Sequence, residues 1–338
     1  MAIAIKTTRA FSNDLLSAHR LLGDPPADAA IVAVAAGGRD AVGALMRWLS
    51  TADDLSPATQ PTVIQQFFAD YAHLPAWADP KRMQRGMTFF QKHMGVIGLT
   101  LGTYSLPYTY LGANGVQLLW LTERIRTDTA RRLQETGDWV FAVNNPKNWV
   151  GTTAIYYTLK IRLIHAAARW FAHQSGRWDD VWGVPVCQED MVGTIGSFSY
   201  IVLRGLRKMG IAMTEQEEED YLHHINVVGY VNGVMEDLTP LNLREAFHLD
   251  KLIVSRQFRP SEAGRGLTKA LLDAIGTLAG PSGNAESARN LAAAQMRFFL
   301  GNDHANDLGI PDVPAETRLM RVVSRLPIFP KLIPTIAP

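Results

Sequence analysis

The sequence is poor in cysteine and in charge, and both shortages narrow the classes of protein to consider. Cys187 is the single cysteine among 338 residues, which excludes a disulfide framework within the chain and a cysteine-ligated zinc site. Charged residues make up 19% of the chain, below the ~25% that is usual for soluble domains, and the net charge is +1. A balance of this kind gives no indication of nucleic acid as a partner.

Several familiar signatures are also missing. The sequence has no P-loop, no glycine-rich dinucleotide fingerprint, no G-x-S-x-G elbow and no H-E-x-x-H pair. At the N-terminus, no charged region precedes an apolar core and a cleavage site. We therefore expect neither a signal peptide nor an N-terminal anchor, and the predicted location is cytoplasmic.

Strand-like alternation is absent too, and helical periodicity runs through the chain. We therefore predict an all-α protein with a single large multi-helix domain. Its predicted parts are an N-terminal helical extension over 1–58, the main helical domain over 59–305, and a Pro-rich C-terminal tail over 306–338 that packs on the body. Among the predicted elements are one long helix over Gln117–Val143 and one helix over Gln188–Met209. Residues 23–30 are predicted to be a non-helical segment that separates two short helices.

The stretch Met94–Thr122 carries no charged side chain, and it is longer than the ~20 residues that span a bilayer. Glycines and Pro107 interrupt it, and tyrosines, Asn114 and Gln117 add polar groups. Such a segment is too broken and too polar for a lipid-facing helix. The sequence therefore favours the wall of a buried core or ligand pocket over a membrane-associated segment.

The most informative stretch is Ala154–Arg177, which has helical periodicity and no Pro or Gly before Gly176. Arg162, His165 and Arg169 are three and four residues apart, so they share one side of this helix among small apolar residues. An unpaired buried charge is costly, so this side needs an anionic or metal-containing partner. Haem fits, because iron takes a neutral imidazole and propionates take cations.

The residues alone leave other readings open. In one, both arginines pair with carboxylates of a neighbouring helix, such as Asp128 or Glu189, and the protein is a helical interaction protein without a metal. In another, a non-haem di-iron oxidase is built on Glu245–His248, with Asp220–His223 as a weaker second motif. In a third, the histidine holds haem for sensing or storage without catalysis.

Three stretches in a fixed order resemble the family of latex-clearing proteins and MpaB-type oxygenases. Arg132–Thr136 is similar to the family's Arg-x-x-x-Thr helix, and Arg162–Arg169 is similar to its Arg-x-x-His-Ala-x-x-Arg signature. Trp182–Met191 is similar to the Gly-x-Pro and Gln-Glu-Asp segment that follows. Each stretch alone is weak, whereas the ordered combination is specific.

The resemblance implies an all-α fold with globin-like central helices and a non-covalently bound haem b. It implies that His165 is the axial ligand of the iron and that Arg162 and Arg169 support the cofactor. It places Arg132 and Thr136 on the opposite side, near bound dioxygen.

At one position the chain departs from the rubber-cleaving members, which can carry a lysine just before the threonine. Glu135 stands there in this sequence, and its carboxylate could act as a base, so we count it among the candidate catalytic residues. The implied function is a haem b-dependent oxygenase of the dioxygenase type. Its partners would be dioxygen and an apolar, unsaturated, isoprenoid-like substrate, with oxidative cleavage of a carbon–carbon double bond as the reaction.

Overall fold

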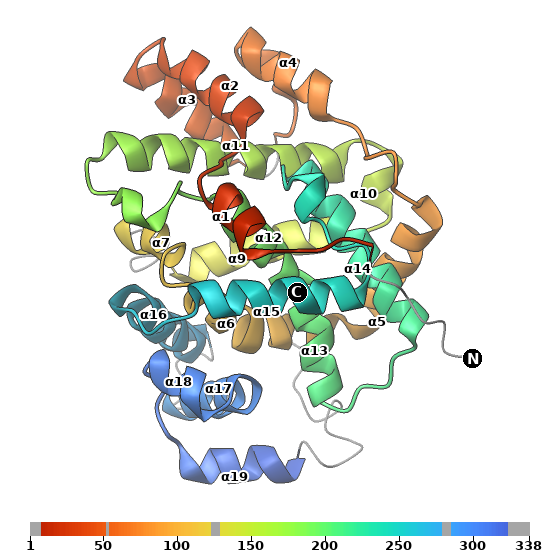
Figure 1. Ribbon diagram of the computed structural model, residues 1–338, viewed down its shortest axis with the longest axis vertical. Helices are drawn as coiled ribbons and strands as arrows, with labels where there is room; N and C mark the ends of the chain where they lie inside the picture. The colour runs from red at the N-terminus through yellow and green to blue at the C-terminus, as the bar shows by residue number, and fades with distance from the viewer. Residues whose placement is uncertain (1–7, 52–53, 123–128, 279–284, 324–338) are drawn as a thin grey trace.

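The computed structural model describes residues 8–51, 54–122, 129–278 and 285–323, and over these ranges the chain is helical with no strand (Figure 1). The all-α prediction is therefore confirmed. Within the same ranges, no helix combines the length and the apolar composition needed to cross a membrane.

The helices divide between the two halves of the chain. In the first half their bounds are α1 Asn13–Arg20, α2 Pro25–Ala35, α3 Arg39–Leu49, α4 Thr62–Tyr71, α5 Pro80–Thr100, α6 Leu106–Tyr110, α7 Val116–Leu121, α9 Thr129–Val143 and α10 Lys147–Val150. In the second half they are α11 Thr153–Gln174, α12 Gln188–Phe198, α13 Tyr200–Lys208, α14 Glu215–Val231, α15 Leu243–Gln257, α16 Glu262–Leu278, α17 Ala285–Leu300, α18 Asn302–Asp307 and α19 Pro314–Val323. A π-helical turn, η2 Leu101–Ser105, joins α5 to α6.

Helix α11 runs across the molecule between two apolar clusters. Leu159, Leu163 and Ala167 are buried on its one side against residues of α2, α3 and α4, which lie above α11 in Figure 1. On its other side, Tyr157 and Ile161 pack against the larger cluster of the main body. Apolar burial on both sides fixes the position of the helix, and its polar residues must find partners at the margins of these contacts.

In the main body, α5 and α14 pack closely because Gly86 has no side chain. A Cβ atom at Gly86 would lie 2.6 Å from the main-chain oxygen of Asp220. The start of α14 carries a capping box, as its sequence predicts: the Thr214 hydroxyl accepts from the Glu217 amide at 3.2 Å, and the Glu217 carboxylate accepts from the Thr214 amide at 2.9 Å.

Two predicted elements were wrong. Residues 23–30 are not a non-helical segment, because α2 begins at Pro25, and proline is well suited to a first helical turn. The single helix predicted over Gln188–Met209 is two helices, since Ser199 has φ −113° and ψ −84° and its hydroxyl donates back to the Ile195 carbonyl at 3.1 Å. Part of the long helix predicted over Gln117–Val143 falls at 123–128, outside the described residues.

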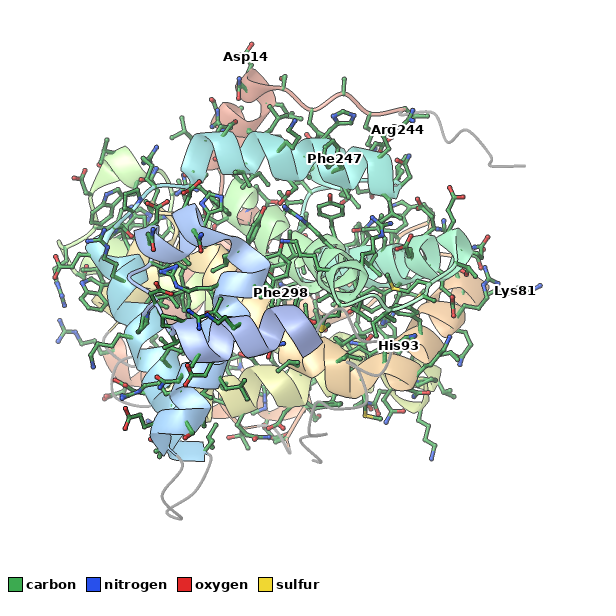
Figure 2. All side chains as sticks on the ribbon, turned by 90° about the horizontal axis from the view of Figure 1, so that it is seen from below. Asp14, Lys81, His93, Arg244, Phe247 and Phe298 are labelled. Carbon is green, nitrogen blue, oxygen red and sulfur yellow. The ribbon has the colours of Figure 1, made fainter. Side chains whose placement is uncertain are left out.

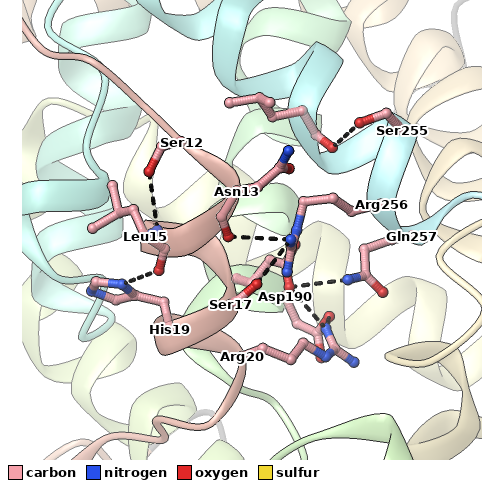
Figure 3. Close-up of polar contacts among 12 residues, drawn as sticks. Ser12, Asn13, Leu15, Ser17, His19, Arg20, Asp190, Ser255, Arg256 and Gln257 are labelled. Carbon is pink, nitrogen blue, oxygen red and sulfur yellow. Dashed lines mark hydrogen bonds and ion pairs between the residues drawn. The ribbon is translucent and has the colours of Figure 1, made fainter.

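The N-terminal helices are tied to the rest of the chain. Helix α1 lies beside α15 in Figures 1 and 2, where Asp14 and Arg244 mark the same outer edge. Arg256 donates to the Asn13 carbonyl at 3.2 Å and to the Ser17 hydroxyl at 3.1 Å (Figure 3). Residues 8–49 are therefore held on the main body, while the domain boundaries at 58 and 305 stay predictions.

Candidate active site

The structure contains a cavity of about 1280 Å³ that is lined by side chains of α3, α6, α7, α9, α11, α12 and α15. This volume exceeds the ~300–1000 Å³ of ordinary small-molecule pockets, so there is room for more than one bound molecule. The second half of the uncharged stretch, from Leu106 to Thr122, supplies much of its wall. The sequence-based expectation of a pocket wall in this stretch is therefore confirmed for residues 106–122.

His165 lies in the wall of this cavity. Its Nδ1 atom is buried without a hydrogen-bond partner, which is unusual because buried polar atoms are nearly always paired. Burial, together with the positive charges of Arg169 and Arg132, lowers the pKa of His165 to about 3. The ring is therefore neutral near pH 7 and keeps a free lone pair, as a metal ligand must.

Three further candidates, Arg132, Glu135 and Thr136, project from α9 into the same cavity. The Arg132 guanidinium donates to Glu135 Oε2 at 3.2 Å, and the Thr136 hydroxyl donates to the Arg132 carbonyl at 2.9 Å. Because the charge of Arg132 affects the pKa of His165, these two side chains lie within electrostatic range of each other. The fold thus brings residues of α9 and α11 to one cavity, as the sequence patterns predict.

Arg162 and Arg169 are placed differently, because neither belongs to the cavity wall. Arg162 forms a bidentate ion pair with Asp24 at 2.6 and 2.8 Å, and both side chains are buried. Arg169 donates to Asp28 at 2.6 Å and to the Val186 carbonyl at 2.9 Å. Both arginines therefore face α2 and have protein partners, and direct contact with a cofactor stays a prediction.

The salt-bridge reading proposed other partners for these arginines. Asp128 lies outside the described residues. Glu189 is fully buried, where it accepts from Arg256 at 2.7 Å and from Gln257 at 3.0 Å. Its neighbour Asp190 pairs with Arg20, so the Gln-Glu-Asp segment ties α12 to α1 and α15 (Figure 3).

The di-iron reading finds little support in the positions of its residues. Glu245 is buried and accepts from the amides of Thr8 and Arg9 at 2.8 and 3.1 Å, whereas His248 is exposed. Asp220 is engaged by Arg82 at 2.9 Å. In the part of the chain that the structure describes, no three His, Cys, Asp or Glu side chains come together as a metal site.

Sequence reasoning missed three polar residues of the cavity wall: Tyr108, Tyr200 and Asp250. The Tyr108 hydroxyl donates to Asp250 Oδ1 at 2.8 Å across 142 sequence positions. Tyr108 belongs to the uncharged stretch that was expected to form a pocket wall. Nothing local in the sequence, however, indicates that it pairs with an aspartate of α15.

Comparisons with known proteins agree with this fold. Residues 96–327 match the family described as "ER-bound oxygenase mpaB/B'/Rubber oxygenase, catalytic domain". A rubber oxygenase from Streptomyces sp. (strain K30) is 27% identical over 312 residues, which are 88% of this chain and 73% of that protein. A solved structure of the latex clearing protein LCP in the closed state superposes with a TM-score of 0.75 at 22% identity, over 93% of this chain and 83% of that chain.

Proposed function

The chain belongs to the family of the ER-bound oxygenase mpaB/B'/Rubber oxygenase catalytic domain, and from this membership we propose that it is a haem b-dependent oxygenase. It uses dioxygen on an apolar, unsaturated, isoprenoid-like substrate and cleaves a carbon–carbon double bond. The observation that carries the proposal is the neutral, unpaired imidazole of His165 in the wall of a large, mainly apolar cavity.

The residues present fit haem b. His165 offers a ring that is not protonated near pH 7, and its Nδ1 makes no hydrogen bond. The cavity volume of about 1280 Å³ leaves space for a flat macrocycle together with a substrate chain. When bound, the haem iron supplies the site at which dioxygen is held and activated. Arg162 and Arg169 support this site by fixing α11 against α2 through their aspartate partners.

Arg132, Glu135 and Thr136 act from α9. Arg132 presents a permanent positive charge, which stabilises negative charge that develops on an oxygen atom in the cavity. Glu135 orients that guanidinium through the contact at 3.2 Å, and its carboxylate can accept a proton. The Thr136 hydroxyl provides a small polar group on the same wall.

The substrate class follows from the cavity walls. Side chains such as Leu119, Leu133 and Ile161 line it, and the segment 106–122 adds no charge. An apolar chain is favoured in such a space because its transfer from water is favourable over the whole buried area. The rubber oxygenase among the relatives agrees with an isoprenoid substrate.

The visible spectrum of the purified protein, before and after dithionite, tests the proposal. We expect a Soret band, one iron per chain, and oxygen uptake with an isoprenoid alkene. His165→Ala should lose the band, whereas His173→Ala should keep it, because His173 is an exposed residue of the same helix. An unchanged spectrum in His165→Ala overturns the ligand assignment, and full haem loading without oxygen uptake favours a non-catalytic haem protein.

A further inference from the structure

A second polar group of residues lies in the cavity wall, on other helices than His165. Tyr108 comes from α6, Tyr200 from the start of α13, and Asp250 from α15. Around them the wall is apolar, with Leu249 and Ile253 as neighbours on α15. Polar side chains in an apolar cavity are the usual source of ligand orientation and specificity.

Within this group, one possible hydrogen-bond acceptor and one possible donor have no hydrogen-bond partner among the described residues. Asp250 Oδ1 accepts from the Tyr108 hydroxyl at 2.8 Å. Among the described residues, Asp250 Oδ2 has only Arg204 Nη1 at 3.8 Å, beyond hydrogen-bond distance, and Arg204 is not part of the cavity wall. The Tyr200 hydroxyl, near enough to Asp250 for the carboxylate to affect its pKa, donates to no described residue. Because both residues line the cavity, one acceptor and one donor remain available to a ligand there.

Two irregularities of the helices bring these residues to one place. The π-helical turn η2 precedes α6, where the Leu106 amide bonds to the Leu101 carbonyl five residues earlier, and π-helical turns occur frequently at functional sites. The break at Ser199 makes Tyr200 the first residue of α13. Because both irregularities lie beside cavity residues, they help to place Tyr108 and Tyr200 at the cavity wall.

The charges select among ligand groups. Burial raises the pKa of Asp250, while the hydrogen bond from Tyr108 and the charge of Arg204 lower it. A ligand carboxylate here would be repelled by Asp250 and would leave its free oxygen without a donor. A hydroxyl group satisfies both partners, because it donates to Asp250 and accepts from Tyr200.

We infer that Tyr108, Tyr200 and Asp250 bind the terminal hydroxyl group of an otherwise apolar ligand chain. The inference rests on the proposed function for the isoprenoid character of that chain, and it makes the substrate class an unsaturated isoprenoid alcohol. Tyr108 holds Asp250 in place, and the other two residues contact the hydroxyl. The polar group fixes one end of the chain, so it sets which double bond lies opposite His165.

Calorimetric binding of three matched ligands tests this site in the purified protein: geranylgeraniol, the same hydrocarbon without the hydroxyl, and the corresponding carboxylic acid. We expect the alcohol to bind about tenfold more tightly than the hydrocarbon, the size of one good hydrogen bond to a charged group, and more tightly than the acid. Tyr200→Phe should reduce the preference for the alcohol about fivefold. Asp250→Asn should weaken alcohol binding and strengthen acid binding.

Two variants serve as controls. Tyr230→Phe removes a tyrosine hydroxyl of α14 outside the cavity wall, and Asp273→Asn neutralises an exposed aspartate that pairs with Lys269 on α16. Both should keep the wild-type affinity ratios among the three ligands. Equal affinity for alcohol and hydrocarbon in the wild type overturns the inference, and so does tightest binding of the acid. Unchanged affinity ratios among the three ligands in folded Tyr200→Phe and Asp250→Asn show that the group is structural only.

The visible spectrum separates failure of this site from failure of the oxygenase proposal. A colourless protein that still prefers the alcohol refutes haem binding but not the hydroxyl site. A haem-loaded protein with no preference for the alcohol refutes the hydroxyl site alone.

Discussion

Two sides of α11 carry polar residues, and they differ in how well those residues are satisfied. Toward α2, Arg162 and Arg169 each have an aspartate at 2.6 Å. Toward the cavity, His165 lines the wall, and its buried Nδ1 atom has no hydrogen-bond partner among the described residues. The charges of both arginines are compensated within the fold, although Arg169 Nη2 is itself unpaired, whereas no described side chain pairs with His165 in this way.

This difference separates residues that hold the structure from residues available to a ligand. A buried ion pair fixes the position of a helix because breaking it leaves an uncompensated charge. An unpaired buried atom costs stability and is retained where something else binds it. Other buried polar atoms also lack partners, among them Arg169 Nη2 and His224 Nδ1, so it is the position of His165 in the cavity wall that favours a ligand.

The largest expected effect is on the α2 side. Arg162→Ala leaves Asp24 buried without its partner, and such a change typically costs ~3–5 kcal/mol of the free energy of unfolding. Equilibrium unfolding in urea, followed by circular dichroism, measures this loss.

The matching control is the exposed pair of Lys269 and Asp273 on α16. Lys269→Ala should change the free energy of unfolding by less than ~1 kcal/mol, because exposed ion pairs contribute little. If the two variants lose equal stability, the Arg162–Asp24 pair does not fix α11 and the comparison between its two sides fails.

The next largest effect is on the cavity side and concerns turnover. Arg132→Ala should lower kcat about 10²–10³-fold, the cost of removing one donor that stabilises developing negative charge. Its stability should change by less than ~0.5 kcal/mol, because the side chain is exposed at the cavity. Oxygen uptake and urea unfolding of the same preparation give both quantities.

Arg131→Ala is the matched control, since Arg131 also binds Glu135, at 3.0 Å, but does not belong to the cavity wall. It should keep kcat within about twofold, in the range of ordinary surface substitutions. Equal losses of turnover in both variants would mean that α9 acts through its general charge and not through Arg132.

The sequence predicted the residues that meet at the cavity better than the partners that hold them. Helix periodicity pointed to His165, and the resemblance to a known family pointed to the α9 residues; both lie in the cavity wall, while their roles stay predictions. The partners of Arg162 and Arg169 were missed because 23–30 was predicted to be a non-helical segment, although Pro25 begins α2. No local pattern encodes the contact of Tyr108 with Asp250, since only tertiary packing brings α6 and α15 together.

The smallest expected effect tests whether a lowered pKa by itself marks the ligand. Burial lowers the pKa of His224 to about 3 as well, yet His224 lies outside the cavity and its Nε2 donates a hydrogen bond to the Val143 carbonyl, 3.1 Å away. Since the unfolded chain protonates His224 near its ordinary value of 6.5, stability should fall as the pH drops below 6.5 and continue to fall toward 3. In that window His224 should make the free energy of unfolding of the wild type fall by about 1 kcal/mol per pH unit. In His224→Gln this contribution should be absent, and urea unfolding at several pH values measures the difference. The substitution should leave the Soret band intact. A loss of that band would mean that a buried neutral imidazole outside the cavity also supports the haem site, and that the position in the cavity wall does not distinguish His165.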